Sequence, residues 1–208
     1  QKMAKIIEEN YSKFDGFVVL HGSDTMSYSA SALSFMLEDL CKPVIFTGSQ
    51  LPIGDLRTDA KENLITAIQV ASLQENKKPA IQEVCLYFEY KLYRGNRTTK
   101  ISAEHFNAFT SPNFPELAES GVHLKVNKDI ILKQKATKKL KVHTDFDDNV
   151  AILKIFPGIN QNVLNAFFAI PNLKGIVLET YGSGNASTEE WFVQTLERAI
   201  HNNIHVIN

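Results

Sequence analysis

Three polar side chains in succession, Ser23, Asp24 and Thr25, follow an apolar run from Phe17 to Leu20. The run has the composition of a strand buried on both faces, and a helical pattern begins directly after the polar residues. In an α/β protein such residues lie at the carboxyl edge of a parallel strand, where ligands bind. A hydroxyl group beside a carboxylate is an arrangement that nucleophilic catalysis uses. The same residue types are preferred helix N-caps, so the local pattern leaves capping and catalysis both open.

Three further loops at predicted strand ends are unusually polar. They comprise residues 47–50, 93–100 and 181–185, with the sequences Thr-Gly-Ser-Gln, Tyr-Arg-Gly-Asn-Arg-Thr-Thr-Lys and Tyr-Gly-Ser-Gly-Asn. Each is also compatible with simple turn chemistry, in which glycine supplies unusual backbone angles. Four polar loops that follow strand-like segments in one chain favour a functional site, but they do not identify a reaction.

The elements that would position these loops alternate between strand and helix, which is typical of a parallel, right-handed, doubly wound α/β sheet. We expect helices over residues 1–13, 26–40 and 58–72, with Thr58 or Asp59 as the cap of the third helix, and strands over residues 17–20, 44–46 and 84–88. The apolar pattern predicts a helical stripe in the second helix, formed by Met26, Ala30, Leu33, Met36, Leu37 and Leu40. It also predicts that the third helix faces the core with Leu64, Ile65, Ile68 and Ala71.

The pattern changes after Lys100. Residues 101–109 predict a short helix, and residues 123–126 with 130–132 predict an antiparallel hairpin. A second alternation predicts strands over residues 151–156, 175–178 and 204–207, and helices over residues 160–168 and 188–202. We therefore expect an N-terminal domain over residues 1–132, a lysine-rich linker over residues 133–148 and part of a second, smaller α/β domain over residues 149–208.

The composition excludes several classes of function. The net charge of −1 over 208 residues argues against nucleic acid as a partner, and no apolar run approaches the length of a membrane span. Cys41 and Cys85 lie in apolar settings and favour a reducing compartment without a disulfide, while the spacing of His201 and His205 does not predict a metal site. Because the chain lacks an initiator methionine and stops within a predicted strand, we expect it to be an interior piece of a longer protein.

The segment from Asp15 to Met26, Asp-Gly-Phe-Val-Val-Leu-His-Gly-Ser-Asp-Thr-Met, resembles the second active-site signature of L-asparaginases, His-Gly-Thr-Asp-Thr. Residues 29–38, 42–50, 92–100, 109–113 and 181–185 resemble the type I, cytoplasmic branch of that family, in the same order. The resemblance implies two α/β domains, a homodimer or homotetramer, and hydrolysis of L-asparagine, or of L-glutamine, without a cofactor.

Carried across residue by residue, the resemblance implies that Ser23, Asp24 and Lys100 match a catalytic threonine, aspartate and lysine. Ser23 and Asp24 would also bind the substrate, with Asp24 holding its α-amino group, and Asn185 matches a residue that helps to hold the substrate, often from a neighbouring subunit. The chemistry is reasonable, since amide hydrolysis requires a hydroxyl or a water to lose a proton, and a lysine beside a carboxylate can move that proton.

The chain departs from the family pattern in three places. Ser23 replaces a threonine, Glu179 stands where some members have an arginine of an allosteric asparagine site, and the first signature, Thr-Gly-Gly-Thr-Ile, is absent. Because that signature carries a threonine nucleophile, we expect it upstream of Gln1 and expect residues 1–208 alone to be inactive. Two alternatives remain open: the glutaminase subunit of an archaeal tRNA-dependent amidotransferase, and a non-catalytic truncated product.

Overall fold

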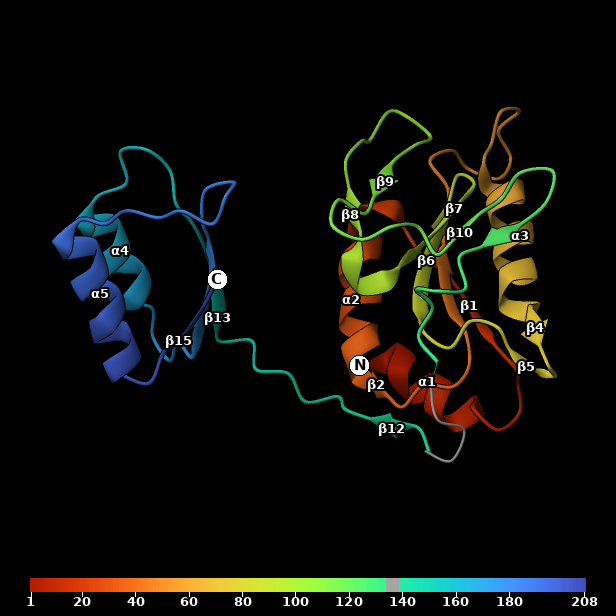
Figure 1. The fold of residues 1–208 in the computed structure, drawn as a ribbon, viewed down its shortest axis with the longest axis horizontal. Coiled ribbons are helices and arrows are strands. Elements are labelled where there is room, and N and C mark those ends of the chain that lie inside the picture. The colour runs from red at the N-terminus through yellow and green to blue at the C-terminus, as the bar shows by residue number, and fades with distance from the viewer. Residues whose placement is uncertain (134–138) are drawn as a thin grey trace. The chain divides into compact units, whose positions relative to one another are not determined.

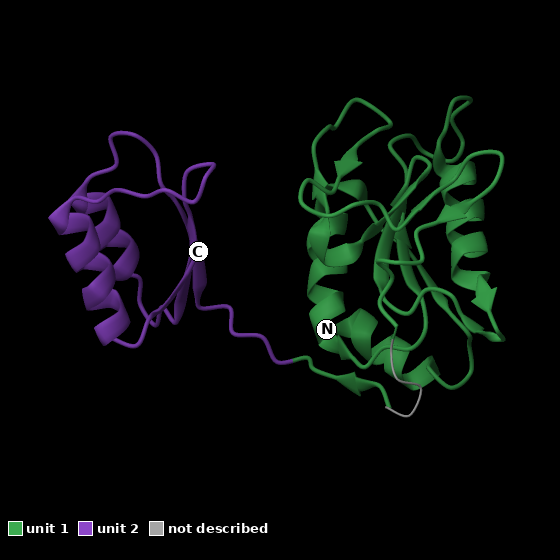
Figure 2. Cartoon of the chain, viewed as in Figure 1, with its two compact units in different colours: residues 1–144 green, residues 145–208 purple. Residues whose placement is uncertain are grey.

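The computed structural model describes residues 1–133 and 139–208. The chain divides into two compact units, residues 1–144 and 145–208 (Figure 2). Residues 134–138 of the predicted linker lie outside the described residues. Each unit is described by itself below.

A six-stranded sheet forms the centre of unit 1. Its strands, in spatial order, are β1 (Phe17–Leu20), β3 (Val44–Thr47), β6 (Val84–Phe88), β7 (Lys91–Arg94), β10 (Ala118–Glu119) and β11 (Lys125–Val126). The pairs β1·β3 and β3·β6 are parallel, as expected for an α/β fold, and the pairs from β6 to β11 are antiparallel. The carboxyl ends of β1, β3 and β6 therefore lie at one edge of the sheet, where the polar loops after β1 and β3 begin.

Helices cover both faces of this sheet (Figure 1). α2 (Met26–Met36) packs on one face with α1 (Lys2–Asn10) nearby, and α3 (Ala60–Ser72) packs on the other. The predicted apolar stripe of α2 is buried, since Met26, Ala30 and Leu33 are each no more than 2% exposed. The alternation of strand and helix therefore predicted the layers of unit 1 correctly.

The predicted core face of α3 is wrong for two of its four residues, since Leu64 and Ala71 are partly buried, with Ala71 packed against the core, but Ile65 and Ile68 are exposed. Ile65 and Ile68 are 63% and 53% exposed, and the buried face consists instead of Asn63, Thr66, Ala67 and Val70. Hydrophobicity misassigned this face because two of its buried side chains are polar, and a polar side chain can be buried when its hydrogen bonds are satisfied. Asn63 and Thr66 both meet that condition.

The predicted burial of residues 17–20 on both faces is met only in part. Phe17 and Val19 pack against the core on one face of the sheet and Val18 against the core on the other, but Leu20 is 66% exposed. Residues 101–109 form no helix. The Ser102 hydroxyl accepts hydrogen bonds from the backbone N–H groups of Glu104 and His105, which is a local alternative to helical bonding. The two residues at either end of this loop pair instead as β8 (Thr99–Lys100) and β9 (Phe109–Thr110).

The predicted hairpin is wrong as well, since β11 pairs with β10, the strand before it, and residues 130–132 form no strand. A buried ion pair holds that segment. Arg94 donates to the Glu83 carboxylate at 2.5 Å and to the carbonyl of Ile130, and the Leu132 N–H donates to Glu83. Side chains from distant parts of the chain therefore decide the path of residues 130–132.

The remaining pairings in unit 1 are short. β4 (Gln74–Glu75) pairs with β5 (Lys78–Pro79), and β2 (Leu37–Glu38) pairs with β12 (Lys141–Val142). Glu38 accepts hydrogen bonds from Lys141 and from the ring of His143, and these partners lower the pKa of its carboxyl to about 2. The β2·β12 pairing therefore attaches residues 141–142 of the predicted linker to unit 1.

Unit 2 is a three-stranded parallel sheet with two helices on one face (Figure 1). Its elements follow the order β13 (Val150–Lys154), α4 (Gln161–Phe168), β14 (Gly175–Glu179), α5 (Glu190–His201) and β15 (His205–Ile207). The Asn160 side chain accepts from the N–H of Val163 at 3.2 Å and so caps α4. Each of these elements was predicted from the sequence to within two residues, because helical and strand periodicity are clean in this part of the chain.

Candidate active site

The first polar loop begins at the carboxyl end of β1. Gly22 is extended, and Ser23, Asp24 and Thr25 form a short 3-10 helix, η1 (Ser23–Thr25), that leads into α2. Neither η1 nor α2 has a side-chain hydrogen bond at its N-cap. The capping alternative for these residues is therefore not what the structure shows, and the side chains of Ser23 and Asp24 have other partners.

The side chain of Lys100 bonds to both residues. Its Nζ atom donates to Ser23 Oγ at 2.9 Å and to Asp24 Oδ1 at 2.7 Å, although these residues lie 77 and 76 positions away in the sequence. The structure therefore brings together all three residues that the resemblance marked as catalytic.

Lys100 reaches this position because the chain turns sharply after β7. The turn is the 3-10 helix η2 (Gly95–Arg97), which packs against α2 and β6. A Cβ atom on Gly95 would lie 2.9 Å from the carbonyl oxygen of Val84 and 3.3 Å from the Cβ of Ala30, so a larger residue would not fit without movement. Glycine at this position allows η2 to pack between these elements, and β8 then carries Lys100 to the site.

The charges of the cluster differ in their exposure. The Lys100 side chain is 16% exposed and the Asp24 side chain is 90% exposed. The hydrogen bond from Lys100, and then its charge, lower the pKa of Asp24 below its ordinary value. Asp24 is therefore an accessible, ionised carboxylate at the surface of the site, suited to a cationic group on a ligand.

Gln50 is a fourth residue of the site. The Ser23 hydroxyl donates to Gln50 Oε1 at 3.2 Å, and Gln50 Nε2 donates to the carbonyl of His105 at 3.0 Å. The sequence marked residues 47–50 as a polar loop without singling out this residue. Its position offered the signal, because Gln50 follows β3, the strand that lies next to β1 in the sheet.

Asn185 lies in unit 2, in the loop that follows β14. The loop is closed by two backbone hydrogen bonds, from Tyr181 N to the carbonyl of Asn185 at 2.9 Å and from Gly184 N to the carbonyl of Tyr181 at 2.7 Å, with Gly184 at a φ of 83°. The part that Asn185 takes in substrate binding stays a prediction.

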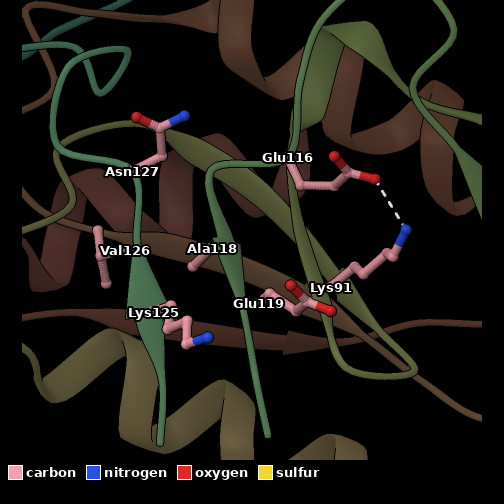
Figure 3. A pocket seen from close by; sticks show the side chains of 7 residues that line it. All are labelled: Lys91, Glu116, Ala118, Glu119, Lys125, Val126 and Asn127. Atoms are coloured by element: carbon pink, nitrogen blue, oxygen red, sulfur yellow. Dashed lines mark hydrogen bonds and ion pairs between the residues drawn. The ribbon is translucent and has the colours of Figure 1, made fainter.

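One cavity of unit 1 adjoins the site and another lies apart from it. One of about 450 Å³ lies at the ends of β1 and β3 and is lined by His21, Gly22, Thr47 and Gly48 among others. Another, of about 300 Å³, lies on the antiparallel strands β7, β10 and β11 and contains the Lys91–Glu116 ion pair (Figure 3). None of the predicted site residues lines either cavity, but the first is lined by His21 and Gly22, the two residues that precede Ser23.

Within residues 1–133 and 139–208, no group of three or more His, Cys, Asp or Glu side chains is placed to hold a metal ion. The helices described there also include none long and apolar enough to cross a membrane. Both cysteines are free thiols, with Cys85 buried and Cys41 partly buried.

Comparison with known proteins places this geometry among relatives. The family model "Asparaginase, N-terminal" matches residues 1–132, and the model "Glutaminase/Asparaginase C-terminal domain" matches residues 149–208. L-asparaginase 1 of Escherichia coli strain K12 is 44% identical over 208 residues, which are 100% of this chain and 60% of that protein. The 60 kDa lysophospholipase of Mus musculus is 43% identical over 207 residues, which are 100% of this chain and 36% of that protein.

A solved structure agrees. L-asparaginase I from Vibrio cholerae matches with a TM-score of 0.90 and 41% sequence identity, covering 99% of this chain and 61% of that one. The chain thus spans between about a third and three fifths of the length of these relatives.

Proposed function

Because the chain belongs to the asparaginase family, we propose that it is part of an enzyme that hydrolyses the side-chain amide of L-asparagine to L-aspartate and ammonia. The observation that carries the proposal is the double hydrogen bond of Lys100 to Ser23 and Asp24. It places an ammonium group, a hydroxyl and a carboxylate within bonding distance at the edge of a sheet where ligands bind.

Lys100 moves the proton in the proposed reaction. An amide carbonyl is a poor electrophile, so the attacking hydroxyl or water must lose a proton as it attacks. Ser23 Oγ lies 2.9 Å from Lys100 Nζ, within direct reach for proton transfer. In the proposed reaction Lys100 passes the proton of the attacking hydroxyl or water to the leaving ammonia as the carbon–nitrogen bond breaks. Where a hydroxyl attacks, a water molecule then hydrolyses the ester that forms and releases L-aspartate.

Asp24 has two roles in this proposal. It orients Lys100 through the 2.7 Å ion pair, and its exposed carboxylate binds the α-ammonium group of the substrate. Asn185 of unit 2 contributes a further substrate contact. From the resemblance to the type I branch we also propose a cytoplasmic homodimer or homotetramer, with L-glutamine as a second substrate.

The test is ammonia release by the natural full-length protein from L-asparagine and from L-glutamine. Ser23→Ala and Asp24→Asn should each abolish most of the activity. Asp15→Asn is a matched control, because Asp15 is an exposed carboxylate before the opposite end of β1. A lysophospholipid belongs in the same assay, since the mouse relative is named a lysophospholipase. Hydrolysis of the lysophospholipid without any release of ammonia from asparagine would refute the proposal.

A further inference from the structure

The side chain of Asp59 does something other than cap α3. It occupies the N-cap position, yet its carboxylate makes no cap hydrogen bond, and Thr58 Oγ1 accepts from the N–H of Ala60 instead. The Asp59 carboxylate accepts from the backbone N–H groups of Gln50, at 3.0 Å, and Leu51, at 3.2 Å. Asp59 therefore fixes the backbone of the loop after β3.

Asn63, one turn further along α3, fixes Asp59 in turn. Its Nδ2 atom donates to the Asp59 carboxylate and to the carbonyl of Gly48, each at 3.0 Å, and its Oδ1 atom accepts from the N–H of Glu89 at 3.1 Å. Asn63 is only 1% exposed, so these bonds form without competition from water. One buried amide thus ties the start of α3 to the loop after β3 and to the turn after β6.

The loop that Asp59 holds ends in the site. Gln50 Nε2 donates to the carbonyl of His105, and this bond turns the Oε1 atom of the same amide toward Ser23. Ser23 Oγ is therefore held between Gln50 Oε1, at 3.2 Å, and Lys100 Nζ, at 2.9 Å. The orientation of the Ser23 hydroxyl depends on where the backbone of Gln50 lies.

We propose that Asp59, locked by Asn63, is a positioning residue for Ser23, and that it acts through the backbone and side chain of Gln50. The inference rests on the proposed function of Ser23. Asp59 touches none of the groups that would meet the substrate. It is connected to Ser23 by two hydrogen bonds, one from the Gln50 N–H to the Asp59 carboxylate and one from Ser23 Oγ to the Gln50 side-chain amide.

An aspartate suits this position because both of its oxygens accept hydrogen bonds and three N–H donors point at them. In Asp59→Asn, one of the oxygens becomes an NH2 group, which would face another donor, and the loop must shift to relieve that contact. Displacement of a reacting group by about 1 Å costs on the order of 100-fold in rate.

The experiment uses the natural full-length protein with four variants: Asp59→Asn, Gln50→Ala, the double variant, and Glu62→Gln as the control. Glu62 is an exposed carboxylate in the first turn of the same helix, so this control removes one charge without touching the loop. Asp59→Asn should lower kcat by about 10- to 100-fold with little change in KM. In the Gln50→Ala background the same substitution should change kcat by less than about twofold, because residues in one chain of contacts are not additive.

Amide hydrogen exchange provides a readout that does not depend on activity. Asp59→Asn should accelerate exchange at the N–H groups of Gln50 and Leu51, while Glu62→Gln should not. If the wild-type protein releases no ammonia from asparagine, the proposed function fails, and exchange still tests whether Asp59 holds the loop. An equal fall in kcat with and without Gln50, or unchanged exchange at both amides, would overturn the inference. Should Asp59→Asn not fold, Asp59→Glu keeps the charge, displaces the oxygens by one methylene and should give the same effects in weaker form.

Discussion

Replacing Lys100 with methionine is the sharpest test of the site, since one ammonium group bonds both Ser23 and Asp24, at 2.9 and 2.7 Å. Methionine keeps the apolar stem and removes the group that carries the proton. Loss of a proton-transfer group costs about 10²- to 10⁴-fold in rate. At roughly 1.4 kcal/mol per factor of ten, we expect the activation free energy to rise by about 3–5 kcal/mol.

The folded state should tolerate this substitution. Asp24 is 90% exposed, so water and salt screen its ion pair with Lys100 and the pair contributes little to the free energy of unfolding. The pKa of Asp24 should rise toward its ordinary value, because Lys100 is the cause of its lowering. A carboxylate whose pKa is lower in the folded state contributes its full stabilisation at pH values above its unfolded-state pKa. This contribution disappears as the pH falls through the folded-state pKa.

The assay is ammonia release from L-asparagine over a range of concentrations, with the thermal midpoint and an NMR titration of the Asp24 carboxyl beside it. Lys100→Arg, which keeps the charge but cannot give up a proton, should be about as inactive as Lys100→Met. Retention of kcat within about threefold of the wild type by a folded Lys100→Met would refute proton transfer by this residue.

Three other substitutions test separate parts of the structure. Ser23→Thr should change kcat/KM by less than about threefold in the ammonia assay, because threonine keeps the hydroxyl and adds only a methyl group that restricts χ1; a loss as large as that of Ser23→Ala would contradict this. Arg94→Met should lower the free energy of unfolding in denaturant by about 3–5 kcal/mol, since it leaves Glu83, which is 4% exposed, charged and without its partner; adding Glu83→Leu should recover much of the loss. At pH values above the ordinary pKa of glutamate, Glu38→Gln should accelerate amide hydrogen exchange in β12. The difference from wild type should vanish as the pH falls to about 2, because Glu38 itself becomes protonated there. Equal exchange in both proteins at neutral pH would show that Glu38 does not hold β12.

Periodicity predicted the layered part of the fold well. The strands at Phe17 and Val84 have the predicted bounds, and the buried stripe of α2 is the predicted one. These features follow from local apolar patterns, which are visible in one sequence. The resemblance supplied Ser23, Asp24 and Lys100, which no local pattern relates across more than 70 residues, and the structure brings them together.

Several misses have a physical cause in common: side-chain hydrogen bonds that hydropathy does not reveal. The path of residues 130–132 depends on Glu83 and Arg94, and the loop at 101–109 depends on Ser102, whose hydroxyl replaces helical hydrogen bonds. Gln50 was overlooked because its role depends on strand order, which places the end of β3 beside the end of β1. Hydropathy carries no information about such pairings, since a buried, satisfied amide and an exposed one have the same sequence letter.

The exposure of Ile65 and Ile68 on α3 has a consequence for mutational tolerance. The folding of unit 1 constrains Asn63, Ala67 and Val70, which are each no more than 1% exposed, and leaves Ile65 and Ile68 largely unconstrained. A scan of substitutions scored only on the amount of folded unit 1 should accept polar residues at 65 and 68 and reject them at 67 and 70. If related chains keep an apolar side chain at 65 and 68, that preference reflects a constraint other than the stability of unit 1. Comparing the substitution scan with the residues found in related chains would separate the two constraints at each position.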